Sequence, residues 1–176
     1  MAWADSRIFR AFLGNVFENS RAFDLSGTPD TFKVALYDND ITPDNDASQA
    51  NSCYNAGQWV TTGNEVFEAG QWAQGGPSLS TPVIDVGTAD VVFFDAVDLA
   101  SGSAADLAAV FGCLVYDDTL TSPDDQGVSY NYFGGSQTVT NGTFTILWSS
   151  SGICIMTLLS FGIANSRSYS KEHDKC

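Results

Sequence analysis

The chain has 176 residues, 44% of them apolar, and its 21 acidic and 7 basic residues give a formal net charge of −14. This is enough apolar material for one globular domain with a substantial core. Residues 34–166 contain no Lys or Arg, and a surface without cations cannot neutralise phosphates, so a nucleic acid is excluded as its ligand. An anionic membrane surface is disfavoured for the same reason.

The N-terminal segment predicts an α-helix from about Asp5 to Asn19, because its apolar residues recur with helical spacing. These residues are Ile8, Phe9, Phe12, Leu13, Val16 and Phe17. Asp5 or Ser6 is expected to cap the first turn, and Arg7 and Arg10 flank the apolar stripe. Such a stripe packs on the domain's own sheet or docks on a partner, and its pattern is the same in both cases. For the second case, Arg7 and Arg10 are our candidate partner-binding residues.

Five short segments with alternating apolar residues follow, separated by clusters of Gly, Asn, Asp and Ser. They are Thr31–Tyr37, Val91–Phe94, Ala109–Tyr116, Val128–Phe133 and Thr143–Trp148. This alternation is typical of strands, and Asn141-Gly142 is a strong hairpin signal before the last of them. Because no helix-length pattern lies between the strands, parallel crossovers are not expected. The sequence therefore predicts a mainly β fold, an antiparallel β-sandwich or barrel-like domain with one N-terminal α-helix.

The expected organisation has three parts: a helical segment (1–25), a β domain (26–153) and a C-terminal extension (154–176). The extension starts apolar and ends polar and basic, so a strand, an arm that reaches a neighbour and a disordered tail all remain open. No signal peptide is expected, because the N-terminus lacks an uninterrupted apolar segment followed by a small-residue cleavage site. The longest apolar run, Ile153–Ile163, is too short to cross a bilayer.

Side chains suited to catalysis are scarce. The one histidine, His173, lies close to the C-terminus, so no Ser-His-Asp or Cys-His set can be built from the body of the chain. We therefore expect neither an enzyme nor a cofactor site. Cys53, Cys113, Cys154 and Cys176 have no CxxC spacing and are expected to be reduced, with a disulfide between Cys53 and Cys113 as the alternative.

One acidic segment resembles a metal site in its composition. Asp38, Asp40, Asp44 and Asp46 place four carboxylates close together in the sequence, and Ca²⁺ prefers such oxygen ligands. The segment lacks the glycine and the distal glutamate of an EF-hand loop. The alternative is a solvated loop in which Asp side chains cap turns.

The order and spacing of several segments carry a family resemblance. The segments are the predicted N-terminal helix, Phe32–Tyr37, Thr42–Asp46, Asn64–Val66, Leu114–Thr119, Tyr132–Gly135 and Gly142–Trp148. In this order they resemble small structural proteins of tailed-phage virions, of the capsid-decoration or minor tail kind. The resemblance implies a virion protein without catalytic residues.

From this resemblance we expect a capsid decoration protein, also called a cement or minor capsid protein, on the exterior of the head. Its expected partners are other virion proteins, above all the major capsid protein, and copies of itself, with a trimer as the simplest oligomer on an icosahedral shell. A minor tail or head–tail component is the alternative. A carbohydrate-binding adhesion module is another, if Trp59, Trp72, Tyr130 and Tyr132 form an exposed aromatic row and not part of the core.

Overall fold

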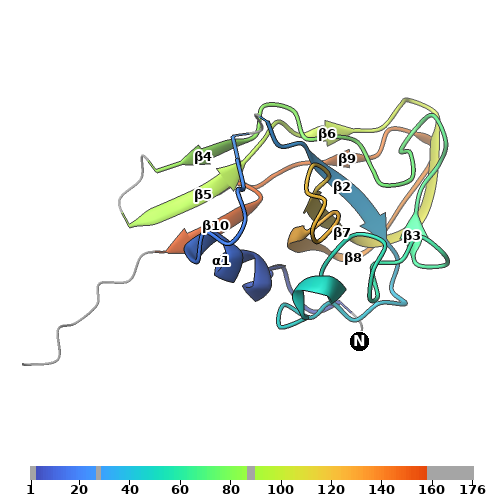
Figure 1. Cartoon of the computed structure of the whole chain (residues 1–176). Coiled ribbons are helices and arrows are strands. Elements are labelled where there is room, and N and C mark those ends of the chain that lie inside the picture. The colour runs from blue at the N-terminus through green and yellow to red at the C-terminus, as the bar shows by residue number, and fades with distance from the viewer. Residues whose placement is uncertain (1–2, 27–28, 87–89, 158–176) are drawn as a thin grey trace, which may run out of the picture.

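Two long antiparallel strands, β7 (Ala105–Asp117) and β8 (Gly127–Gly142), form the centre of the structure (Figure 1). The computed structural model describes residues 3–26, 29–86 and 90–157. The elements are β1 (Arg7–Ile8), α1 (Arg10–Phe17), β2 (Phe32–Tyr37), the 3-10 helix η1 (Gln49–Asn51), β3 (Glu65–Val66), β4 (Val83–Asp85), β5 (Val91–Asp95), β6 (Leu99–Ala100), β7 (Ala105–Asp117), β8 (Gly127–Gly142), β9 (Thr145–Ile146) and β10 (Cys154–Thr157). The predicted fold class is confirmed: the structure is mainly β and sandwich-like, with antiparallel sheets and one α-helix near the N-terminus.

The strands form three sheets. The five-stranded sheet has the order β1-β8-β7-β2-β3, the three-stranded sheet has the order β10-β5-β4, and β6 pairs with β9. The two larger sheets meet where Phe32 of β2 contacts Phe94 of β5, with ring centroids 5.4 Å apart. Both rings are buried, so part of the hydrophobic core lies between these sheets.

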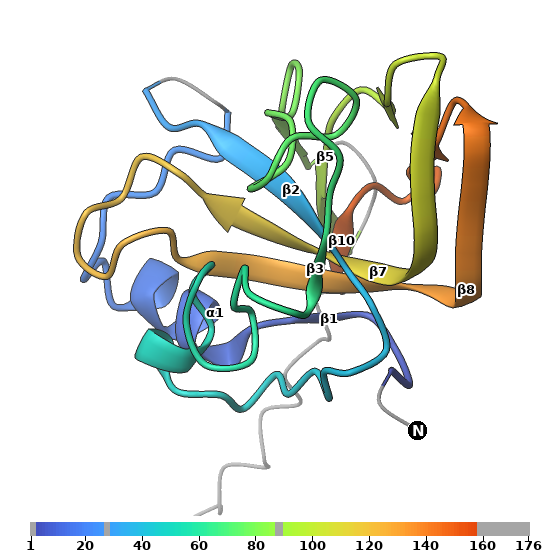
Figure 2. The same ribbon diagram turned by 90° about the vertical axis from the view of Figure 1, so that its right-hand side faces the viewer.

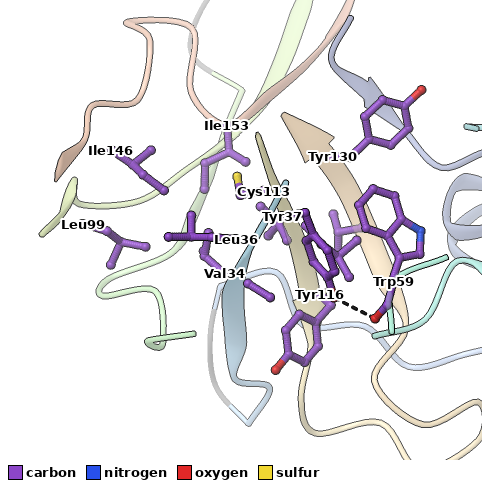
Figure 3. Close-up of a cluster of buried hydrophobic side chains, with 14 of the residues drawn as sticks. Val34, Leu36, Tyr37, Trp59, Leu99, Cys113, Tyr116, Tyr130, Ile146 and Ile153 are labelled. Carbon is purple, nitrogen blue, oxygen red and sulfur yellow. Dashed lines mark hydrogen bonds between the residues drawn. The ribbon is translucent and has the colours of Figure 1, made fainter. Parts of the chain in front are cut away.

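The short β6–β9 pair closes one end of the core. Leu99 of β6 lies opposite Ile146 of β9, and both belong to the buried hydrophobic cluster that also contains Leu36 of β2 (Figure 3). All three side chains are buried. The β6–β9 pair therefore contributes to the same core as β2, although it belongs to no larger sheet.

A cluster of aromatic rings fills the other end of the core, toward the N-terminal segment. Its centre is Trp59, which makes edge-to-face contacts with Trp3, Phe9 and Tyr37 at centroid distances of 6.0, 5.9 and 5.1 Å. The Tyr37 hydroxyl donates a hydrogen bond to the Trp59 carbonyl oxygen at 2.7 Å (Figure 3). Aromatic pairs in this geometry stabilise a core beyond the area that they bury.

The predicted helix from Asp5 to Asn19 was wrong at its start. Arg7 and Ile8 form strand β1 and pair with β8, and the helix begins only at Arg10. Neither Asp5 nor Ser6 caps it, since the N-cap residue is Phe9 and makes no side-chain cap. The physical reason is that the first residues gain backbone hydrogen bonds at a sheet edge, which the helical pattern did not reveal. The segment 1–25 is therefore partly strand.

The predicted hairpin at Asn141-Gly142 was also wrong. Strand β8 runs through Gly134 and Gly135 to Gly142, and the following strand, β9, pairs with β6. Of the predicted strand Thr143–Trp148, only Thr145 and Ile146 are in a strand. The inward alternation was nevertheless correct, because Phe144 and Ile146 are buried.

The chain beyond residue 153 begins as part of the β structure. Residues 154–157 form β10, which pairs with β5 over its whole length; the rest of the expected extension lies outside the described residues. Cys53, Cys113 and Cys154 are free thiols, the first two buried, as expected from the sequence, and Cys176 lies outside the described residues. No helix in the described part of the chain is long and apolar enough to span a membrane.

Candidate functional site

The acidic segment from Asp38 to Asp46 forms turns and brings together no metal site. Asp38 Oδ1 accepts the backbone N–H of Asp40 at 2.9 Å, and Asp44 Oδ1 accepts that of Asp46 at 2.9 Å. Among the described residues, no three Asp, Glu, His or Cys side chains are grouped to hold a metal ion. The turn-capping interpretation is thus confirmed for Asp38 and Asp44, and the Ca²⁺ hypothesis has no support from the geometry.

The two candidate partner-binding arginines lie on different elements. Arg7 is on β1 and forms an ion pair with Asp5 at 2.6 Å, while Arg10 begins α1 and forms one with Asp46 at 2.6 Å. The side chains of Arg7 and Arg10 are 57% and 71% exposed. Because both side chains are exposed, their guanidinium groups are accessible to a partner. Exposed ion pairs of this kind also contribute little to stability.

The apolar stripe beside these arginines packs mainly on the domain itself. Phe9 and Phe12 are buried, and they contact Tyr130 and Phe23 with ring centroids 5.5 and 4.8 Å apart. The packed interpretation of the helix is therefore correct for this part of the stripe. Only its last turn is open, where Phe17 is 72% exposed.

Three of the four aromatic residues considered for sugar stacking belong to the core. Trp59, Trp72 and Tyr130 are buried, and the Trp72 indole N–H donates to the Val34 carbonyl oxygen at 3.1 Å. Tyr132 is half-buried. The four residues therefore form no exposed row, and the core alternative is confirmed for the first three.

A groove of about 770 Å³ lies on the concave side of the bent β7–β8 ribbon. Figure 2 shows the two strands turning together at the right of the view. The bend occurs at Gly134 and Gly135, which have positive φ of 78° and 151°, a conformation that glycine adopts without steric cost. The groove is lined by β8 on both sides of this bend, by residues 143–149 and by Ser6, Gly152 and Ile153.

The side chain of Gln137 spans the inside of the bend. Its Nε2 donates to the carbonyl oxygen of Phe133 at 3.3 Å and, more weakly, to that of Gly135 at 3.5 Å. Half-buried rings of Tyr132, Phe133 and Trp148 also line the groove. The walls thus combine partly accessible aromatic faces with the amides of Asn131 and Gln137 and several hydroxyl groups.

The groove carries no formal charge. None of its lining residues is Asp, Glu, Lys, Arg or His, although the chain has a net charge of −14. Sequence reasoning missed this site because its walls come from segments whose approach depends on the bend in β8. The Gly134-Gly135 pair was the available signal, but we interpreted it as a separator between strands.

Two buried carboxyl groups have raised pKa values, and neither lines the groove. Burial raises the pKa of Glu65, whose two oxygens accept hydrogen bonds from the Gly75 N–H and the Tyr54 hydroxyl. Burial also raises the pKa of Asp117 to about 6. These groups hold loops together, and they do not provide an acid or a base in the groove.

In comparisons with known proteins, no family model, curated protein or solved structure matched the chain. Its function must therefore be argued from its own residues and surfaces.

Proposed function

We propose that the chain is a noncatalytic structural protein of a tailed-phage virion, and within that class a decoration protein on the exterior of the head. The observation that carries the binding role is the outer face of the three-stranded sheet β10-β5-β4, where exposed apolar side chains lie beside the carboxylates of Asp85 and Asp95. Support for the virion assignment comes from the order and spacing of the sequence segments that resemble virion proteins. Three of them, Phe32–Tyr37, Leu114–Thr119 and Tyr132–Gly135, lie wholly or largely in the adjacent strands β2, β7 and β8.

Strand register defines the two faces of the three-stranded sheet. Ile84, Phe94 and Cys154 lie opposite one another on β4, β5 and β10, and Phe94 packs against β2. Because successive side chains of a strand point to opposite faces, Val83 and Ile155 point away from the core. They are 47% and 49% exposed.

Further apolar side chains border this outer face. Phe93 lies opposite Ile155 and is half-buried, while Val86 and Val97, next to the ends of β4 and β5, are 70% and 55% exposed. Apolar surface gathered on one face is typical of protein–protein contacts. We infer that this outer face contacts the major capsid protein or a second copy of the chain, with a homotrimer as the simplest oligomer.

The charge distribution agrees with a place outside the packaged genome. Residues 34–166 carry acidic groups and no Lys or Arg, and such a surface is repelled by nucleic acid. Decoration also needs only modest affinity at each site, because many copies bind a repeating lattice.

The test is the position of the chain in particles of the phage that encodes it. Heads and tails are separated on a gradient and analysed by mass spectrometry, and an electron-microscopy map of the intact particle locates the protein. We expect it in the head fraction and on the outer surface of the shell. A minor tail or head–tail component would instead be found with the tails or the connector, and absence from purified particles would refute the virion assignment.

A pair of variants tests the proposed contact face. Combining Val83→Asp with Ile155→Asp places two charges on the outer face, where we expect at least tenfold weaker binding to undecorated heads, equivalent to about 1.4 kcal/mol. Ser136→Asp, an exposed position at the corner of β8, is the control and should bind like the unmodified protein. If the unmodified protein, the double variant and Ser136→Asp all bound equally well, the contact would lie on another face of the protein.

A further inference from the structure

The groove described above is unusual for this protein because it is neutral. An uncharged cavity in a chain of net charge −14 selects against anionic ligands through the surrounding field, and it offers no carboxylate or cation to pair with a charged one. Its volume of about 770 Å³ lies within the range of about 300–1,000 Å³ that is typical of small-ligand sites. These properties favour a neutral ligand.

The polar groups of the groove have hydrogen-bonding capacity to spare. Within the described part of the chain, no hydrogen bond is made by the Tyr132 hydroxyl or by the hydroxyl groups of Thr143 and Thr145, and both threonines are exposed. Gln137 uses its Nε2 across the bend, so its Oε1 is left to accept. Hydroxyl and amide groups both donate and accept, as is needed to bind a ligand with many hydroxyl groups.

Two aromatic rings of the groove are held in place by neighbouring rings. Tyr132 is held on one side by Trp3, whose ring is nearly parallel at an interplanar angle of 18° and a centroid distance of 6.2 Å. Phe133 packs on the buried Phe144 at 6.2 Å. Rings supported from behind keep a fixed orientation, which lowers the entropic cost of binding a ligand against them.

We propose that this groove binds a neutral saccharide, with sugar rings against Tyr132 and Trp148 and sugar hydroxyls bonded to Gln137, Thr143 and Thr145. This inference goes beyond the virion role and does not depend on it. An extended neutral peptide is the competing ligand. Among the described residues, β8 pairs with β7 along one edge and with β1 only at Ser129 and Tyr130 along the other. The rest of that second edge offers backbone groups to which a peptide strand can bond. The aromatic and hydroxyl content of the walls favours the saccharide.

Indole N–H signals in a ¹⁵N NMR titration give a direct test. Among the four tryptophans only Trp148 lines the groove, whereas Trp59 is buried in the aromatic cluster and acts as an internal control. The probes are maltotriose, cellotriose and chitotriose, each added to millimolar concentration. At least one of them should shift the Trp148 signal in a saturable way and leave that of Trp59 in place.

Two further probes test the ligand class. Trigalacturonate, an anionic trisaccharide, should bind at least tenfold more weakly than the best neutral one because of the acidic surroundings. A neutral peptide, N-acetyl-tetraglycine amide, should produce no saturable shift. Comparable binding of trigalacturonate, stronger binding of the peptide, or no Trp148 shift with any neutral sugar would overturn the proposal.

Variants locate the site on the groove walls. Gln137→Ala removes one amide from an exposed position, and we expect about three- to tenfold weaker binding. Thr145→Glu places a charge in the groove and should weaken binding more than tenfold. Thr140→Glu adds the same charge to an exposed residue of β8 that does not line the groove and should leave affinity unchanged. If Thr140→Glu weakened binding as much as Thr145→Glu, the groove would not be the binding site.

Discussion

Tyr54 and Tyr116 stack face to face, with ring centroids 4.6 Å apart and an interplanar angle of 7°. The Tyr54 hydroxyl donates to Glu65 Oε2 at 3.0 Å, and the Tyr116 hydroxyl donates to the Gly75 carbonyl oxygen at 2.9 Å. Glu65 Oε1 in turn accepts the Gly75 N–H at 2.6 Å. This pair of rings therefore ties the loop around Gly75 to strands β3 and β7.

Tyr116→Phe tests the buried hydrogen bond of this network. Removing the hydroxyl leaves the Gly75 carbonyl oxygen without this partner in a buried site, so we expect a loss of about 1–3 kcal/mol in the free energy of unfolding, measured by urea denaturation. Tyr132→Phe is the matched control, because the Tyr132 hydroxyl has no hydrogen bond in the part of the chain that the structure describes. Equal losses in both variants would contradict this account.

Gly76→Ala tests the close approach of two backbone segments. Gly76 has a φ of +79°, and a Cβ at this position would overlap the carbonyl oxygen of Val34. Gly134 has nearly the same φ, +78°, with open space around its Cβ position. Gly134→Ala should therefore cost only the backbone strain, about 1–2 kcal/mol. We expect Gly76→Ala to cost several kcal/mol more or to prevent folding, as measured by circular dichroism and urea denaturation.

The pH dependence of stability should depend on Asp117. This side chain is 0% exposed, and its pKa is raised to about 6, chiefly by burial and further by the neighbouring Asp30. The unfolded pKa is about 3.9, so the folded state binds the proton more tightly. The stabilisation that results is fully present below about pH 4 and is lost as the pH rises through about 6.

Asp117→Asn should remove this pH dependence. We expect the free energy of unfolding of the unmodified protein to fall by up to about 3 kcal/mol more than that of the variant between pH 4 and 7. Urea denaturation at a series of pH values measures the difference. Asp90→Asn, at an exposed position, controls for the loss of one charge, and parallel profiles for the protein and Asp117→Asn would show that Asp117 does not titrate in this range.

Reversing both exposed arginines tests whether they take part in docking. Arg7→Glu with Arg10→Glu should change the free energy of unfolding by about 0.5 kcal/mol or less, as is usual for exposed positions. If these residues meet a capsid partner, binding to undecorated heads should weaken in a salt-dependent way, since interface charges act mainly on rate and specificity. Undiminished binding at low salt would restrict docking to other surfaces, such as the outer face of β10-β5-β4.

The unmodified protein is expected not to bind duplex DNA at physiological salt, because residues 34–166 contain no Lys or Arg to replace the counterions of the phosphates. Electrophoretic mobility shifts over a range of salt concentrations measure this. A salt-sensitive complex with submicromolar affinity would mean that the basic ends of the chain bind DNA by themselves.

Local pattern in the sequence was enough to predict the fold class and several strands. Short apolar runs at Phe32–Tyr37 and Val91–Phe94 are typical of strands, and strands β2 and β5 lie there. The turn-forming tendency of Asp38 and Asp44 is equally local, because each carboxylate bonds a backbone N–H two residues ahead. Such features depend on neighbours in the chain, and a sequence displays those neighbours directly.

Partners that are distant in the chain were decided only by the tertiary structure. Arg7 and Ile8 form a strand and not a helix because β8 offers them an edge, and β9 pairs with β6 because Ile146 and Leu99 can both be buried there. The neutral groove exists because β8 bends at Gly134 and Gly135 and residues 143–149 then line it opposite the earlier part of the strand. Periodicity records whether a side chain is buried, but the choice among possible partners depends on the combined packing of the whole chain.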